Sequence, residues 1–160
     1  EYNMDTGEIT ITGNNLKYIT KNDIVTAKES LKYFEKKKMA IAKGNAIAEH
    51  EGTRIQGDKL TAYFVNAPAG DLEIKELHAH DNVTIVTKGG EVSRGEKAVY
   101  KASKDVAILS GNVRITQGET QLSGDKAAVN FATGQSRLLN KGSGRVRVLL
   151  PTSGKKKKGQ

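Results

Sequence analysis

Short segments in which apolar and polar residues alternate follow one another along the chain. Residues 83–86, 112–116 and 145–150 are rich in β-branched side chains and mostly alternate, which is typical of strands with one buried face. Residues 27–42 have helical propensities, but they align with three strand-like copies. We therefore interpret LKYFE and MAIA within that segment as strands joined by a lysine-rich turn. The pattern predicts an all-β protein.

The strand-like segments recur as a repeat with two landmarks. The first is a Gly-Asn or related pair at residues 13–14, 44–45, 81–82, 111–112 and 144–145, at intervals of 31, 37, 30 and 33 residues. The second, Gly-Asp-Lys in its clearest form, lies at residues 57–59, 95–97 and 124–126, with Ala-Lys-Glu at 27–29. Periods of this length indicate stacked supersecondary units. Because Gly, Asn and Asp tolerate positive φ, we expect both landmarks to be tight hairpin turns.

The repeat also predicts the domain organisation. Tyr2 precedes Gly13 by eleven residues, as Tyr33 and Tyr100 precede their own glycines, so we expect the chain to open inside a repeat. The longest interval contains NAPAGDL, which we interpret as a surface loop. We predict a single domain over residues 1–150 and a basic, disordered tail over residues 151–160.

Composition narrows the class of protein. The 160 residues suffice for one domain, but only 36% are hydrophobic and 5% aromatic, with no Trp, which favours a thin slab of strands. With no cysteine, neither a disulfide nor a thiolate site can form. The longest stretch without a charge is eleven residues, too short for a membrane-spanning helix. No signal-peptide pattern is visible.

Residue types that carry catalysis or bind metals are few. His78 and His80 share a strand face, but His50 is the only other histidine, so we interpret the pair as exposed polar residues and expect no metal. GKKKKG near the end lacks the Lys-Ser/Thr of a phosphate loop, and acids that recur in each copy are interpreted as turn residues. We therefore predict no cofactor and no enzymatic activity.

The excess of basic residues raises the question of whether the protein binds nucleic acid. The net charge is +8, but four of these charges are the run 155–158, so the body is only modestly basic. Single-strand binders interleave aromatic platforms with basic residues, whereas most of the eight aromatics here lie at repeat positions that look internal. We predict that nucleic acid is not a partner.

The landmarks, together with the sequence YKASKDVAILSGNVRITQGETQLSGDKAAVNF at residues 100–131, resemble the OstA-like family of lipopolysaccharide transport proteins. The ending GRVRVLLPTSGKKKKGQ is similar to that of LptA-type members, which finish on an alternating Val/Arg strand, a proline and a lysine-containing tail. The resemblance implies an incompletely closed antiparallel β-jellyroll with an apolar interior. It further implies a non-catalytic carrier of lipopolysaccharide in the periplasm of a Gram-negative bacterium.

The resemblance also implies partners. Such proteins join end to end through terminal strands, here to inner-membrane LptC-like and outer-membrane LptD-like jellyroll domains, with head-to-tail self-association as a further expectation. TGEITITG and VRVLL are the expected edges, with Arg145, Arg147 and Pro151 limiting pairing at the second. Alternatives are the periplasmic domain of an LptC-type component, an N-terminal domain of the outer-membrane one, and a lipid-free structural β-repeat protein.

The alternation of apolar and polar residues predicts which side chains line the lipid groove. Ile24 and Thr26 fall where the family's first inward strand contributes to lipid contact, although Thr26 is polar where an aliphatic residue is expected. The predicted groove-lining residues are Ile24, Met39, Ile41, Ile47, Ile55, Val83, Ile85, Val106, Ile108, Val113, Ile115, Leu122 and Phe131. For any one of them taken singly, a purely structural core position is the favoured interpretation, and in an open jellyroll the core and the lipid groove partly coincide.

Overall fold

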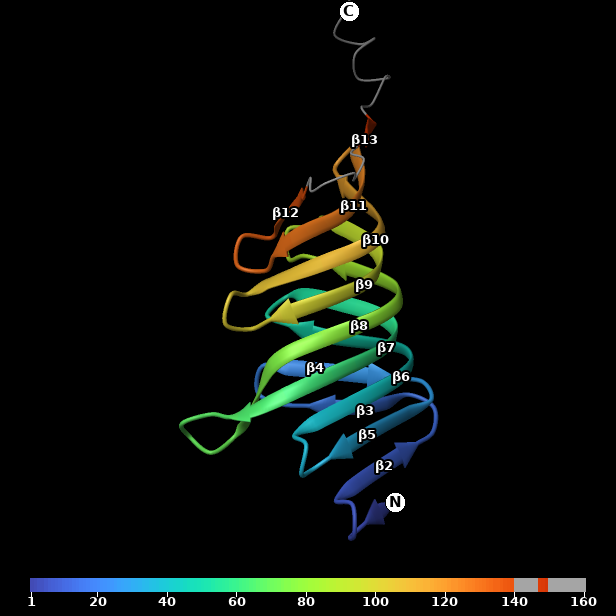
Figure 1. The fold of residues 1–160 in the computed structure, drawn as a ribbon, viewed down its shortest axis with the longest axis vertical. Coiled ribbons are helices and arrows are strands. Elements are labelled where there is room, and N and C mark those ends of the chain that lie inside the picture. Colours follow the sequence, from blue (N-terminus) through green and yellow to red (C-terminus); the bar gives the residue numbers. More distant parts are fainter. Residues whose placement is uncertain (140–146, 150–160) are drawn as a thin grey trace, which may run out of the picture.

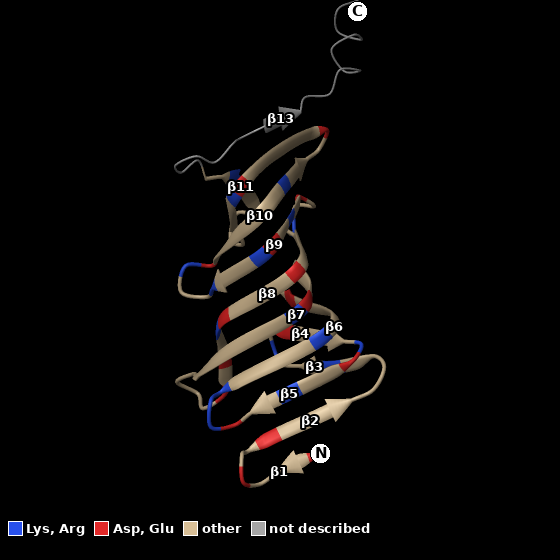
Figure 2. Ribbon diagram, turned by 45° about the vertical axis from the view of Figure 1, so that its right-hand side comes forward, with Lys and Arg blue, Asp and Glu red and all other residues tan. Residues whose placement is uncertain are grey.

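The computed structural model describes residues 1–139 and 147–149, which form a stack of antiparallel strands (Figure 1 and, turned by 45°, Figure 2). The strands are β1 (Tyr2–Asn3), β2 (Glu8–Thr12), β3 (Leu16–Ile19), β4 (Asp23–Ala27), β5 (Ser30–Phe34), β6 (Met39–His50), β7 (Thr53–Asn66), β8 (Leu72–Val86), β9 (Val92–Lys101), β10 (Val106–Gln117), β11 (Thr120–Asn130), β12 (Gln135–Leu138) and β13 (Arg147–Leu149). Over these residues the chain is all-β, as predicted, and contains no helix that could cross a membrane.

The long strands β6 to β11 each contribute to two facing walls. The first wall consists of β1, β2, β5, β12, the N-terminal halves of β6, β8 and β10, and the C-terminal halves of β7, β9 and β11. The second wall consists of β3, β4, β13 and the opposite halves. The walls meet along a corner where the strands bend, and their turns meet along an opposite seam (Figure 1). The result is an incompletely closed antiparallel jellyroll, in agreement with the predicted fold.

The corner is built from β-bulges rather than from turns. The strand register shifts between Lys43 and Ala46 in β6, between His80 and Val83 in β8, and between Ser110 and Val113 in β10. Each shift contains one of the Gly-Asn or Asp-Asn landmarks. A bulge adds a residue to one strand and bends it sharply, which is how one strand enters both walls. The prediction that these landmarks are hairpin turns is therefore wrong, although the positive φ on which it rested is present.

The two landmarks of the repeat contact each other across neighbouring strands. Gly111 has a φ of +82°, and a Cβ there would lie 2.5 Å from Glu96 Oε2. Asn112 Nδ2 donates a hydrogen bond to Glu96 Oε1 at 2.7 Å, and Asn82 Nδ2 donates to Asp58 Oδ2 at 3.0 Å. The acid of Gly-Asp-Lys thus accepts from the asparagine of the next bulge. Gly-Asp-Lys lies inside the strands β7, β9 and β11, so its predicted role as a turn is also wrong.

The bulges determine which side chains face the interior. In β10 the inward side chains stay at odd-numbered positions on both sides of the bulge, from Leu109 to Val113. In the neighbouring β11, which has no extra residue, the inward side chains change from even-numbered to odd-numbered positions between Leu122 and Ala127. One face of each strand therefore remains inside both walls, and a single core runs between them.

Several local predictions are confirmed. LKYFE and MAIA correspond to β5 and the start of β6, joined by the turn at residues 35–38. NAPAGDL forms the connection between β7 and β8, closed by a hydrogen bond from Ala67 N to Asp71 O at 2.7 Å. The strand predicted over 145–150 is described only for residues 147–149, and the tail predicted over 151–160 lies outside the described residues.

Candidate functional site

An apolar groove of about 240 Å³ lies between the walls near their N-terminal end. Its lining consists mainly of aliphatic and aromatic side chains from strands β2 to β8. The lining residues are Ile9, Ile11, Lys17, Tyr18, Val25, Leu31, Lys32, Tyr33, Ala40, Ile41, Ala42, Leu60, Ala62, Phe64, Leu72 and Leu77. The only charged side chains among them are two lysines, so the interior itself presents no carboxylate to a bound molecule.

Small side chains create this space. The inward positions of β6 and β7 that border the groove include Ala40, Ala42 and Ala62, which leave room where larger side chains would fill the gap. Tyr33 and Phe64 close one part of the lining through an edge-to-face contact with ring centroids 6.3 Å apart. The groove is therefore an apolar channel with an aromatic boundary.

A second cavity, of about 350 Å³, lies at the seam between the walls. Ile55, Leu77 and Phe131 contribute apolar surface to it, and its polar residues include the Asp23 and Asp105 carboxylates. Leu77 borders both cavities. The Leu77 side chain is thus a wall shared by the groove and the seam cavity.

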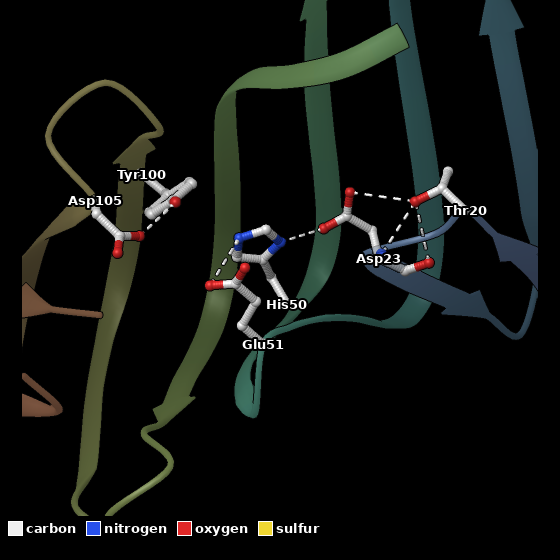
Figure 3. Close-up of polar contacts among 6 residues, drawn as sticks. All are labelled: Thr20, Asp23, His50, Glu51, Tyr100 and Asp105. Atoms are coloured by element: carbon white, nitrogen blue, oxygen red, sulfur yellow. Dashed lines mark hydrogen bonds and ion pairs between the residues drawn. The ribbon is translucent and has the colours of Figure 1, made fainter. Parts of the chain in front are cut away.

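Polar contacts order the rim of the seam cavity (Figure 3). His50 Nδ1 lies 2.5 Å from Asp23 Oδ1, which joins β6 to β4 in the second wall. From the first wall, the Tyr100 hydroxyl donates a hydrogen bond to Asp105 Oδ1 at 2.7 Å, and its ring stacks on Phe131 with centroids 4.5 Å apart. The His50 and Tyr100 rings lie 6.5 Å apart, so the two walls approach each other here.

The environment of Tyr100 keeps its hydroxyl protonated. Burial raises the pKa of Tyr100 well above its usual value, and the hydrogen bond to the Asp105 carboxylate acts in the same direction. The phenol, neutral at physiological pH like any tyrosine, therefore keeps its proton into more alkaline solution and serves as a donor to Asp105. This arrangement fixes the tyrosine ring at the rim.

Seven of the predicted groove residues face the interior. Six of these are buried and the seventh, Leu122, is partly buried and packs against the core. The inward residues are Ile55, Val83, Ile85, Val113, Ile115, Leu122 and Phe131. Of these, Ile55 and Phe131 border the seam cavity, whereas the others belong to the packed core.

Five of the other six predicted groove residues face outward, and their predicted orientation is wrong. They are Ile24, Met39, Ile47, Val106 and Ile108, which are neither buried nor part of the core cluster. The reason is visible in β10, where the neighbours Ala107 and Leu109 are fully buried, so that Ile108 between them faces outward. The sixth, Ile41, is partly buried beside the buried Ala42 and borders the groove, as predicted. In β4 the inward residues are Val25 and Ala27, so Thr26 faces outward with Ile24.

Most of the groove-lining residues were not predicted from the sequence, because they are alanines or lie in the first five strands. Large aliphatic residues were assigned to the interior of β6, where the buried residues are in fact alanines. The groove-lining residues can be identified from strand register. Once one inward residue on β6 is known, its register partners on β5 and β7 must also face inward. Leu31, Ala42 and Leu60, for example, are direct register partners.

The histidines do not converge. His50 contacts Asp23 at the seam, whereas His78 Nε2 lies 3.0 Å from Glu76 Oε1 on the outer face. Burial lowers the pKa of His80, and the charge of Lys59 opposite it acts in the same direction. The described residues contain no cluster of three metal-ligating side chains.

Comparisons with known proteins agree with this architecture. A family model described as "LptA/(LptD N-terminal domain) LPS transport protein" matches residues 25–135 and 94–160. No curated protein matches the sequence. Among solved structures, LptH of Pseudomonas aeruginosa, described as the LptA homologous periplasmic component of the lipopolysaccharide transport device, superposes with a TM-score of 0.57 at 9% identity, over 92% of this chain and 96% of that one. That likeness supports the fold. Because the family model spans more than half of the sequence, this chain belongs to the LptA/LptD N-terminal family of lipopolysaccharide transport proteins.

Proposed function

We propose that this chain is a non-catalytic carrier of the LptA type that binds lipopolysaccharide through its acyl chains, in the periplasm of a Gram-negative bacterium. The observation that carries the proposal is the apolar groove between the walls, lined by Val25, Leu31 and Phe64 among others. The matching family and the periplasmic description of LptH support the transport role and the compartment.

The energetics favour such a groove. Each CH₂ removed from water contributes roughly 0.8 kcal/mol, so an acyl chain of about a dozen carbons gains on the order of 10 kcal/mol. A lining of aliphatic side chains provides this shielding without hydrogen bonds that fix the chain in one place. Since Leu77 borders both the groove and the seam cavity, an acyl chain in the groove would lie next to an opening between the walls.

The ends of the jellyroll suit pairing with further jellyroll domains. Among the described residues, β3 pairs only with β4, and its Tyr18 and Ile19 are 44% and 61% exposed. At the opposite end of the part that the structure describes, β12 and β13 each pair only with β11. Unpaired strand edges add further strands readily. We therefore propose that the chain bridges LptC-like and LptD-like domains by head-to-tail pairing, and that it can pair with itself in the same way.

Photocrosslinking from two adjacent residues tests lipid binding. Phe64 lines the groove, whereas Tyr63 faces outward and is 37% exposed. A photoreactive phenylalanine analogue at position 64 should label added lipopolysaccharide, and the same analogue at position 63 should not, although position 63 is more accessible.

Equal labelling at both positions, or labelling only at Tyr63, would contradict groove binding. Absence of labelling at both positions, in protein that still forms oligomers, would instead support a lipid-free structural role. The adjacent pair Val25 and Ile24 offers a second comparison, because Val25 lines the groove and Ile24 faces outward.

A further inference from the structure

Two arginines lie directly opposite each other on the outer face of the second wall. Arg94 in β9 is the register partner of Arg114 in β10, and both side chains are exposed. The same row continues to Thr84 on one side and to Ser123 on the other. Beyond Ser123, the next residue in register is Arg147 of β13. Basic and hydroxyl-bearing side chains thus share one line across the four strands β8 to β11.

Among the described residues, no acidic side chain lies within ion-pair distance of these two guanidinium groups. The ion pairs formed by the described residues do not include Arg94 or Arg114. By contrast Arg54, on the same wall, contacts Glu49 Oε1 at 3.1 Å. Like charges placed directly opposite each other in a sheet are destabilising, so this arrangement would be stabilised by a bound anion.

The arginines also border a polar hollow at the corner, of about 390 Å³. Thr84, Asn82 and Asn112 contribute to its lining, together with one carboxylate, that of Glu96. Asn112 holds this carboxylate through the 2.7 Å hydrogen bond. Charge, hydrogen-bond donors and concavity therefore coincide at one place that lies outside the apolar groove.

We propose that Arg94 and Arg114 form a binding site for a phosphate group, either free phosphate or a phosphate monoester of a lipid headgroup. A guanidinium presents two parallel N–H donors that match the oxygens of a tetrahedral oxyanion. Two such groups on adjacent strands, about 4.8 Å apart, can approach one phosphate from both sides, with the Thr84 hydroxyl beside them. This inference goes beyond acyl-chain binding and does not depend on it.

Thermal unfolding in inorganic phosphate tests the site. Phosphate should raise the melting temperature of the wild type above that in chloride at equal ionic strength. Arg94→Gln and Arg114→Gln should each abolish this increase, and without phosphate each should melt at or above the wild-type temperature because the repulsion is gone. Arg54→Gln is the matched control, and it should retain the phosphate-dependent increase.

Titration followed by the Nε–Hε NMR signals of the arginines provides the second measurement. Phosphate should shift the signals of Arg94 and Arg114 but not that of Arg54, and Arg114→Gln should weaken binding at Arg94 about tenfold or more. Equal shifts at all arginines, or the same effect with chloride, would mean non-specific screening and would overturn the proposal.

Two further arms identify the source of the phosphate. Vesicles containing phosphatidic acid, which ends in a monoester, are compared with phosphatidylglycerol vesicles in phosphate-free buffer. Binding to phosphatidic acid alone that is lost in Arg94→Gln indicates a lipid headgroup, whereas a response to inorganic phosphate alone indicates the free anion. Failure of every arm refutes the phosphate site but leaves the Phe64 and Tyr63 comparison unaffected, so the two proposals fail separately.

Discussion

Replacement of two isoleucines on the same strand tests which face of β10 is inside. Ile115 is fully buried between the walls, whereas Ile108 lies on the outer face between two buried neighbours. Ile115→Ala and Ile108→Ala remove the same atoms from the same strand. The two variants therefore differ chiefly in the environment that those atoms leave.

The expected losses follow from burial. Ile→Ala removes three carbon atoms, about 2.4 kcal/mol at roughly 0.8 kcal/mol each, and a cavity left in a packed core adds to this, for a total of about 2–5 kcal/mol. Ile115 has no exposed surface, so the whole amount applies. Ile108 is partly in water, and its loss should stay at or below about 1 kcal/mol.

Urea unfolding of both variants gives the free energy of unfolding by linear extrapolation, with unchanged slopes showing that the unfolded states are comparable. A loss for Ile108→Ala equal to or larger than that for Ile115→Ala would refute the assignment, because it would place Ile108 inside and shift the inward phase of β10 by one residue.

Three further predictions concern the corner, the seam and the groove. Gly111→Ala should destabilise the protein by about 1–3 kcal/mol more than Gly90→Ala, as measured by urea unfolding, because both glycines have positive φ but only a Cβ at position 111 meets a neighbouring side chain. Burial raises the pKa of Tyr100, so the stability it contributes is complete below its usual pKa near 10 and decreases above it. Tyr100→Phe should therefore reduce the alkaline fall in the free energy of unfolding above about pH 10. Ala40→Leu narrows the groove and should weaken lipopolysaccharide binding, whereas Ala128→Leu on the outer face should not, a difference that equilibrium binding measures.

The strands and their repetition were predictable because their causes are local. The alternation of apolar and polar side chains, the β-branched residues and the turn at residues 67–71 are properties of short segments. Each of them correctly predicted a strand or a connection of the structure. The segment at residues 27–42 shows the value of the repeat. Its propensities allow a helix, and only its alignment with the other copies gave the correct prediction of two strands.

The corner was not predictable from the same signals. Positive φ at Gly111 and Asn112 suits a hairpin turn as well as a bulge, and the choice is made by a contact with Glu96, sixteen residues earlier in the neighbouring strand. That contact depends on register, which the sequence pattern does not specify by itself. The five predicted groove residues that face outward have the same cause, because a prediction that places large aliphatic side chains inside fails wherever the buried residues are alanines.

The sizes of the inward side chains explain why the space between the walls is not uniform. In β6 the buried residues are alanines, among them Ala42 and Ala46, and the apolar groove lies at that end. In β10 the corresponding positions include Leu109 and Ile115, which are fully buried in the packed core. At the seam beside β12, the hydroxyls of Ser93 and Ser136 lie 3.1 Å apart, so the walls are in contact there. The bulges repeat with little change along the stack, and the choice between alanine and a larger side chain at the inward positions therefore determines where an apolar groove remains between the walls.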